Sequence, residues 1–206
     1  VTSQFYFCGL PLRLDTYANC QFACQYCFAA ARGGQRGARG LRPVDPDLLL
    51  RRLVRLRRDR SSAVGQMVGV RQAIHFGGMS DPLPPAERRL GVSLRVLKEL
   101  ATDDYPVVLS TKSTLVAEPR YADTLRRSNA LVQFSFSTTD DTLSRRVDRG
   151  APVTSERLRA IEKLRKAGVK VAARLQPILP GHEEDALLMI EQLGEVGVLH
   201  AGFEFL

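Results

Sequence analysis

The sequence contains no apolar run that approaches the roughly 18 residues needed to cross a membrane. Its first residues, VTSQFYFCGL, also lack the basic and apolar zones of a signal peptide. Hydrophobic residues make up 44% of the 206 residues and charged residues 25%, which are ordinary values for a globular protein. We therefore predict a soluble, cytoplasmic protein that has no membrane partner.

Cysteine is scarce as well: the sequence has four, and three of them lie within eight residues, in the stretch CQFACQYC. Four cysteines grouped in this way do not make the disulfide framework of a small secreted domain. In a reducing cytoplasm, such a group indicates a metal or redox site instead. We expect the fourth cysteine, Cys8, to be a small buried residue.

Lysine is rare, at five residues, whereas arginine numbers 25; the formal net charge is +8 and the pI about 9.7. This charge favours an anionic partner such as nucleic acid. The arginine bias of a GC-rich genome would produce the same excess, so charge alone does not decide the partner. Directly behind the cysteine group, the loop-like segment RGGQRGARG and its flank supply candidate phosphate contacts, namely Arg32, Arg36, Arg39 and Arg42.

Apolar periodicity divides the chain into alternating strand-like and helix-like segments. Strands are predicted at residues 10–17, 71–78, 105–113, 130–139, 169–181 and 198–206. Helices are predicted at residues 45–60, 85–101, 118–129, 154–168 and 183–197. This order requires an α/β fold with a parallel sheet and helical crossovers, either open or closed into a partial or full barrel. We see no repeat and no linker, so we predict a single domain over residues 1–206; because the chain ends on an apolar strand, we expect C-terminal sequence to be absent or disordered.

The spacing C-x3-C-x2-C allows Cys20, Cys24 and Cys27 to converge on one metal centre. Structural zinc takes four ligands, and no candidate for the fourth stands at a recognisable zinc spacing. Those candidates are Cys8, His75, His182 and His200. An iron–sulfur cluster prefers thiolates, and three thiolates on a [4Fe–4S] cluster would leave one iron open to an external ligand. A redox dithiol would leave Cys20 without a role.

The stretch CQFACQYC resembles the C-x3-C-x-aromatic-C signature of the radical SAM superfamily, with Tyr26 at the aromatic position. The resemblance implies that Cys20, Cys24 and Cys27 hold a [4Fe–4S] cluster whose open iron binds the amino and carboxylate groups of S-adenosylmethionine. It implies an electron donor such as a flavodoxin or ferredoxin, and a 5′-deoxyadenosyl radical that abstracts a hydrogen from the substrate. It also implies a partial (β/α)6 TIM-like barrel with parallel strands, open on one side, with the cluster at its mouth.

Two neighbouring motifs are similar to the branch of this superfamily that contains spore photoproduct lyase and DNA repair photolyase-like proteins. In HFGGMSDP, Gly77, Gly78 and Met79 stand where the family's glycine-rich stretch meets the methionyl amino group through backbone carbonyls. SDPLPPAE is similar to the branch's tDPyqPxE, which makes Asp81 a candidate cofactor contact. Helix capping is the alternative role for Asp81 and Glu87.

Three later motifs of the same branch supply further candidates. LSTKST carries Lys112 at the C-terminal end of a predicted strand, the edge that binds ligands in parallel α/β folds, and the resemblance implies pairing with the carboxylate of S-adenosylmethionine. In FSFSTTDD, Ser135 and Ser137 share one face of a strand and are candidates for the ribose or carboxylate. In ARLQPILPG, Arg174 is a candidate for an anion or the adenosyl moiety. Each motif has a purely structural alternative. Lys112 could be a solvated loop lysine, the serines of FSFSTTDD could cap the next helix, and the prolines of ARLQPILPG could merely end a strand.

The branch implies a nucleic-acid substrate that is repaired or modified. No cysteine follows Cys27, whereas the cysteine that returns a hydrogen atom in photoproduct lyases lies in their C-terminal region, so direct reversal of a thymine photoproduct is not expected. Where the branch often has Glu-Pro, this chain has Asp148-Arg149, a departure that we place in a loop. Modification of a peptide, protein or small metabolite is the alternative enzymatic function, and a zinc-stabilised binding module is the non-enzymatic one. We expect His75 and His200 to be packed histidines.

Overall fold

The computed structural model describes residues 1–3, 9–31 and 40–205. Its main sheet has the strand order β1-β2-β5-β6-β7-β8-β9. These strands are β1 (Thr2–Ser3), β2 (Leu12–Leu14), β5 (Ile74–Phe76), β6 (Val107–Thr111), β7 (Ala130–Phe136), β8 (Lys170–Ile178) and β9 (Ala201–Phe205). From β2 to β9 all neighbours are parallel, and β1 pairs antiparallel with β2 at the edge. The predicted α/β fold with six parallel strands is therefore confirmed.

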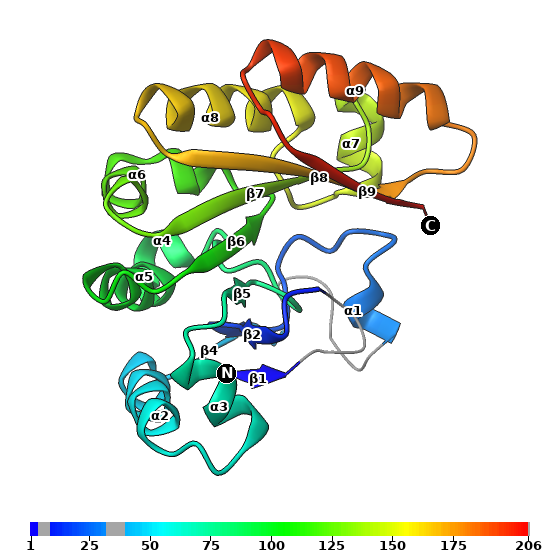
Figure 1. The fold of residues 1–206 in the computed structure, drawn as a ribbon. Coiled ribbons are helices and arrows are strands. Elements are labelled where there is room, and N and C mark those ends of the chain that lie inside the picture. The colour runs from blue at the N-terminus through cyan, green and yellow to red at the C-terminus, as the bar shows by residue number, and fades with distance from the viewer. Residues whose placement is uncertain (4–8, 32–39, 206) are drawn as a thin grey trace.

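Helices connect the parallel strands and cover the outer side of the curved sheet (Figure 1). They are α2 (Pro46–Arg58), α3 (Ala63–Gly69), α4 (Glu87–Leu90), α5 (Val92–Thr102), η1 (Thr114–Ala117), α6 (Pro119–Arg126), α7 (Asp141–Val147), α8 (Thr154–Lys166) and α9 (Glu183–Glu195). The short helix α1 (Phe28–Ala31) lies apart from this layer (Figure 1). A small antiparallel pair, β3 (Tyr17–Ala18) with β4 (Arg42–Pro43), lies near the start of the chain. Within the described residues the main sheet has two edge strands, β1 and β9, and so does not close on itself, which agrees with a partial barrel.

The predicted helix at residues 85–101 is two helices in the structure. Gly91 has a φ of +64°, a left-handed conformation that ends α4 and immediately precedes α5. Glycine adopts this conformation without steric cost, so the chain can turn between two helices that share one apolar pattern. The short helices α3 and α7 were not predicted, because seven residues give too few turns for a periodic signal.

The strands divide their side chains between two faces. In β7, Ala130, Val132, Phe134 and Phe136 alternate as buried residues, and all belong to the main hydrophobic core. The residues between them, including Gln133 and Ser135, are half-buried and point to the opposite face. One face of the sheet therefore packs against helices, and the other presents polar groups to the inside of the partial barrel.

Candidate functional site

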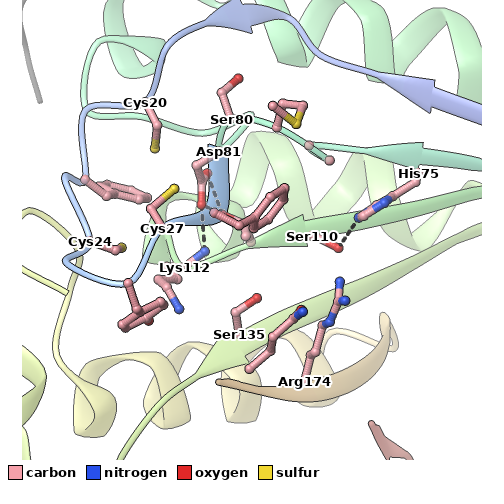
Figure 2. Close-up of a pocket in the computed structure, with 18 of the residues that line it drawn as sticks. Cys20, Cys24, Cys27, His75, Ser80, Asp81, Ser110, Lys112, Ser135 and Arg174 are labelled. Atoms are coloured by element: carbon pink, nitrogen blue, oxygen red, sulfur yellow. Dashed lines mark hydrogen bonds between the residues drawn. The ribbon is translucent and has the colours of Figure 1, made fainter. Parts of the chain in front are cut away.

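A cavity of about 390 Å³ lies on this polar inner face, near the carboxyl ends of the parallel strands. Its size falls within the range of roughly 300–1,000 Å³ that is typical of small-molecule pockets. All three clustered cysteines line it, together with most of the predicted cofactor contacts, which are Tyr26, Gly77, Gly78, Met79, Asp81, Lys112, Ser135 and Arg174. Figure 2 shows the cysteines at one end of the cavity and Arg174 at the other.

Ser137 is the one predicted cofactor contact that the structure does not bring to this cavity. The strand β7 ends at Phe136, so the alternation that places Ser135 on the inner face does not continue to Ser137. The Ser137 hydroxyl instead donates a hydrogen bond of 3.1 Å to Asp148 Oδ2, and the residue lines a separate, small cavity.

The cysteine loop, residues 20–27, is fastened to the end of α7 and to the segment that follows it. The backbone N–H of Gln25 donates to the carbonyl of Val147 at 2.8 Å, and the N–H of Gly150 donates to the carbonyl of Phe22 at 2.8 Å. A Cβ added at Gly150 would lie only 2.8 Å from the carbonyl oxygen of Gln21, so two backbones meet here without space for a side chain. Tertiary contacts thus define the course of a loop that has little regular structure of its own.

The thiols of this loop have the chemistry of soft-metal ligands. Cys24 is buried, and Cys20 and Cys27 are partly buried. Burial, with a smaller effect of Asp81, raises the pKa of Cys20 to about 11. Burial also raises the pKa of Cys24, more than the nearby Lys112 ammonium lowers it. Thiols with raised pKa values are protonated at neutral pH, so binding of a metal or cluster releases protons.

These thiols fit an iron–sulfur cluster better than a closed zinc site. All three cysteines line one cavity, which also offers room for a further ligand. In the part of the chain that the structure describes, no group of three or more His, Cys, Asp or Glu side chains already has the arrangement of a metal site. Cys8, a candidate fourth ligand, lies outside the described residues.

The glycine-rich stretch after β5 forms another part of the cavity wall. Gly77 has a φ of +95°, and an added Cβ would lie 2.6 Å from Pro82 Cδ, so both conformation and space require glycine. The carboxylate of Asp15 accepts hydrogen bonds from the backbone N–H groups of Met79, at 2.9 Å, and Ser80, at 3.3 Å. The stretch is thereby held with its backbone along the cavity.

Asp81 fastens the next loop to the end of β6. Its carboxylate accepts hydrogen bonds from the backbone N–H groups of Leu83 at 2.8 Å and Lys112 at 2.7 Å, and from the Thr111 hydroxyl at 2.8 Å. Burial raises the pKa of Asp81, which these hydrogen bonds only partly offset. Asp81 lines the cavity, but its oxygens are already used by the protein, so its role is to hold the loop rather than to cap a helix.

Glu87 does cap a helix. Its fully buried carboxylate accepts from the backbone N–H groups of Ser93, at 3.1 Å, and Leu94, at 2.9 Å, in the first turn of α5. The hydroxyls of Tyr17 and Tyr121 also donate to it. Glu87 is not among the residues that line the cavity. It caps a helix, which is the alternative role that the sequence offered.

Lys112 directly follows β6 and is buried, not a solvated loop residue. Its Nζ lies 3.6 Å from Asp148 Oδ1 and 5.4 Å from the centroid of the Tyr26 ring. Among the described residues, this Nζ has no hydrogen-bond partner. Burial lowers the pKa of Lys112, but Tyr26 and Asp148 outweigh burial and raise it, so the ammonium stays charged at neutral pH. The cavity therefore contains a buried cation whose hydrogen-bond donors are unused.

The far end of the cavity is a row of polar side chains from neighbouring strands. His75 Nε2 lies 2.8 Å from Ser110 Oγ, which in turn donates to Gln133 at 2.9 Å. Burial and the charges of Arg174 and Arg13 lower the pKa of His75 to about 4, so this histidine is neutral at pH 7. It is packed, as expected.

Other predicted residues stand elsewhere. His200 is exposed just before β9, and the expectation that it is packed was wrong, because the strand begins at Ala201, three residues later than the predicted segment 198–206. Arg42, in β4, is exposed and does not line the cavity. The other three arginines of the basic segment, Arg32, Arg36 and Arg39, lie outside the described residues.

Sequence reasoning missed a buried ion pair between Asp148 and Arg157. Arg157 Nη2 lies 2.6 Å from Asp148 Oδ2, and both side chains are fully buried. Asp148 occupies the place that we assigned to a loop departure, where an acidic residue of the branch was replaced by another. The retained acidic character was the signal that could have identified Asp148. Nothing in the sequence distinguished Arg157 from the other arginines of its predicted helix.

Comparisons with known proteins agree with this geometry. The family model of the Radical SAM superfamily matches residues 14–193. The uncharacterized protein Rv2578c of Mycobacterium tuberculosis (strain ATCC 25618 / H37Rv) is 26% identical over 199 residues, which cover 94% of this chain and 57% of that protein. The chain therefore spans less than two thirds of the length of this curated relative.

Among solved structures, a spore photoproduct lyase mutant with bound AdoMet and dinucleoside spore photoproduct matches with a TM-score of 0.69 and 17% identity; the match covers 93% of this chain and 54% of that one. The SuiB protein of Streptococcus suis bound to the precursor peptide SuiA matches with a TM-score of 0.66 and 15% identity, over 94% of this chain and 39% of that one. At such low identity these matches establish a shared fold.

Proposed function

Because this chain belongs to the radical SAM superfamily, whose members use a [4Fe–4S] cluster and S-adenosylmethionine, we propose that it is an enzyme that holds such a cluster on Cys20, Cys24 and Cys27. When bound and reduced, these cofactors supply a 5′-deoxyadenosyl radical that abstracts a hydrogen atom from the substrate. The observation that carries the proposal is one cavity that collects three cysteines, a glycine-built wall and an ammonium with unused donors.

In this proposal, Lys112 binds the carboxylate of S-adenosylmethionine. The buried cations Lys112 and Arg157 share a single ion-paired carboxylate, that of Asp148. A buried charge is costly unless it is paired and hydrogen-bonded. Asp81 lies nearby, but its carboxylate is used by backbone and hydroxyl donors. A ligand carboxylate at Lys112 Nζ would give the ammonium the hydrogen bonds that it lacks.

The remaining wall of the cavity would orient the rest of the cofactor. The backbone of Gly77, Gly78 and Met79 would receive the methionyl amino group. Ser135 and Arg174 are register partners on β7 and β8 and both line the cavity, which places a hydroxyl and a guanidinium side by side for the ribose or adenine. Asp81 would act indirectly, because it fixes the loop that carries this wall.

We further propose nucleic acid as the substrate and a cytoplasmic setting, with a flavodoxin or ferredoxin as the electron donor. The net charge of +8 supports a polyanionic substrate. One fold relative is bound to a dinucleoside substrate, which supports the same choice. A peptide is the second candidate, because another fold relative is bound to a precursor peptide. In the described part of the chain no helix is long and apolar enough to span a bilayer.

Anaerobic reconstitution with iron and sulfide tests the cofactor proposal. We expect brown protein with about four irons per chain that cleaves S-adenosylmethionine when a reductant is added. The variant Cys20→Ala/Cys24→Ala/Cys27→Ala should stay colourless. A colourless wild type that binds one zinc tightly would contradict the proposal and support a zinc-stabilised binding module.

Salt-dependent binding separates the two substrate candidates. If nucleic acid is bound through its phosphates, the logarithm of the binding constant should fall linearly with the logarithm of salt concentration, by about 0.7–0.9 per phosphate contact. Single- and double-stranded oligonucleotides and an acidic peptide of equal charge are compared at each salt concentration. Absence of measurable oligonucleotide binding at low salt would exclude nucleic acid.

A further inference from the structure

Asp148 lies immediately after α7 and is fully buried. Its two carboxylate oxygens have separate sets of partners. Oδ2 accepts hydrogen bonds from Arg157 Nη2, at 2.6 Å, and from Ser137 Oγ, at 3.1 Å. Oδ1 accepts one from the Tyr26 hydroxyl and lies 3.6 Å from Lys112 Nζ. One oxygen therefore faces the protein scaffold, and the other faces the cavity side.

The scaffold side is rigid. Arg157 is held by the carbonyl of Pro152 at 2.7 Å, the carbonyl of Ser135 at 2.7 Å and the hydroxyl of Ser144 at 2.9 Å. Each of its nitrogens therefore has a fixed acceptor, and the guanidinium cannot turn without breaking several buried hydrogen bonds. Asp148 is fixed in turn, so the position of Oδ1 is set by residues outside the cavity.

The cavity side joins two parts that come from distant places in the sequence. Tyr26 stands between Cys24 and Cys27, so its hydroxyl ties the cysteine loop to Asp148 Oδ1. The same oxygen attracts Lys112 Nζ, which lies 5.4 Å from the centroid of the Tyr26 ring. At 3.6 Å the attraction is one of charge and does not use the N–H donors of Lys112. Asp148 can thus place the ammonium and still leave its donors to a ligand.

We propose that Asp148 is a positioning residue that sets the cysteine loop and the Lys112 ammonium in a fixed relation, so that one ligand can reach the metal centre and the ammonium together. This inference rests on the proposed function, because the ligand is taken to be S-adenosylmethionine. It adds a residue that is not among those lining the cavity and that acts through Tyr26 and Lys112.

A double-mutant cycle tests the inference on cluster-loaded protein without reductant, in which binding of S-adenosylmethionine is measured by calorimetry. Asp148→Asn keeps an oxygen that can accept from Tyr26 and removes only the charge. It should weaken binding about tenfold in the wild-type background and less than about twofold in Lys112→Met, because the effect of the charge passes through the ammonium. A merely structural role predicts the same factor in both backgrounds, and that result, or unchanged affinity in Asp148→Asn, would overturn the inference.

A second pair of variants covers the case in which Asp148→Asn does not fold. Tyr26→Phe removes only the hydroxyl that joins the cysteine loop to Oδ1, and Tyr121→Phe removes a hydroxyl that donates to the buried Glu87. We expect Tyr26→Phe to weaken S-adenosylmethionine binding several-fold, and Tyr121→Phe to leave the affinity unchanged. Equal affinities in the two variants would contradict the role of Oδ1.

Amide hydrogen exchange on the protein as isolated distinguishes failure of this inference from failure of the proposed function. Exchange at residues 20–27 should be about tenfold faster in Tyr26→Phe than in wild type, and unchanged in Tyr121→Phe. If wild type binds no S-adenosylmethionine, the proposed function fails, but faster loop exchange in Tyr26→Phe would still support the fastening by Asp148. Unchanged exchange would overturn that as well.

Discussion

Two buried carboxylates, Asp148 and Glu87, organise two regions of this protein in different ways. Both are fully buried, and each accepts a hydrogen bond from a tyrosine hydroxyl far away in the sequence. The further partners of Glu87 are a second phenol and two backbone N–H groups in α5. Those of Asp148 include two cations and a serine hydroxyl. The two carboxylates are thus equally buried, but the donors around Glu87 are uncharged, whereas those around Asp148 include two cations.

The two regions therefore differ in what they offer to a ligand. Neutral donors around Glu87 satisfy its charge locally and hold β3, α5 and α6 together. The cations around Asp148 outnumber it, and one of them faces a cavity. The partners of the two carboxylates, and not their depth, distinguish the two regions.

The largest effect should come from breaking the Asp148 region at its metal ligands. Cys27→Ala should abolish iron binding and cleavage of S-adenosylmethionine together, because two thiolates cannot hold the cluster that three would. The substitution should leave the Glu87 region intact, so the free energy of unfolding of the protein as isolated should change by less than about 1 kcal/mol. Iron analysis and urea denaturation measure the two effects. Full iron content in the variant would remove Cys27 from the site.

Removing the charge of each carboxylate in turn should lower the free energy of unfolding by different amounts. Asp148→Asn leaves Arg157 and Lys112 buried without a counter-charge, which should cost about 3–5 kcal/mol. Glu87→Gln keeps the shape and leaves one or two donors without an acceptor, which should cost about 1–3 kcal/mol. Urea denaturation of both variants measures the difference. A larger loss in Glu87→Gln would reverse the comparison.

The cavity region should also show a pH dependence of its own. The pKa of His75 is lowered to about 4 from an ordinary value of 6.5, so the unfolded chain takes up a proton at a higher pH than the folded protein does. The free energy of unfolding should therefore fall by about 3 kcal/mol as the pH drops from about 6.5 to 4. His75→Gln should lose this component of the pH profile. Identical profiles for variant and wild type would mean that His75 titrates normally.

Lys112→Met should sharpen the comparison within the Asp148 region itself. Loss of a charged donor should weaken the binding of S-adenosylmethionine by about 1.5–3 kcal/mol, which lowers the affinity about 10- to 100-fold, while the cluster stays bound. Calorimetry together with the absorbance of the cluster measures both. Leu97→Ala, a core variant of α5 away from the cavity, serves as the control that loses stability without losing affinity. Unchanged affinity in Lys112→Met would leave the ammonium without a ligand role.

Sequence reasoning was strongest for the order of the strands and for the alternation of side chains within them. The alternation of Ala130, Val132, Phe134 and Phe136 is a local pattern, and the sheet follows it residue by residue. It was weaker where a strand stops, as the misplacement of Ser137 shows, because the last inward-facing residue depends on where the pairing with β8 ends. The splitting of the helix at Gly91 likewise depends on how two helices pack, which a periodic pattern does not contain.

What the sequence determined by itself is the chemistry of the site: three thiols in one loop, a glycine stretch after a strand, and one lysine at the edge of the sheet. These are local groups whose spacing along the chain limits where they can lie. Only the tertiary structure decided that Asp148 and Arg157 lie behind Lys112 and Tyr26, and that Glu87 does not reach the cavity. The physical reason is that burial and ion pairing are properties of groups brought together from distant positions, and no local pattern records which acidic residue receives which partner.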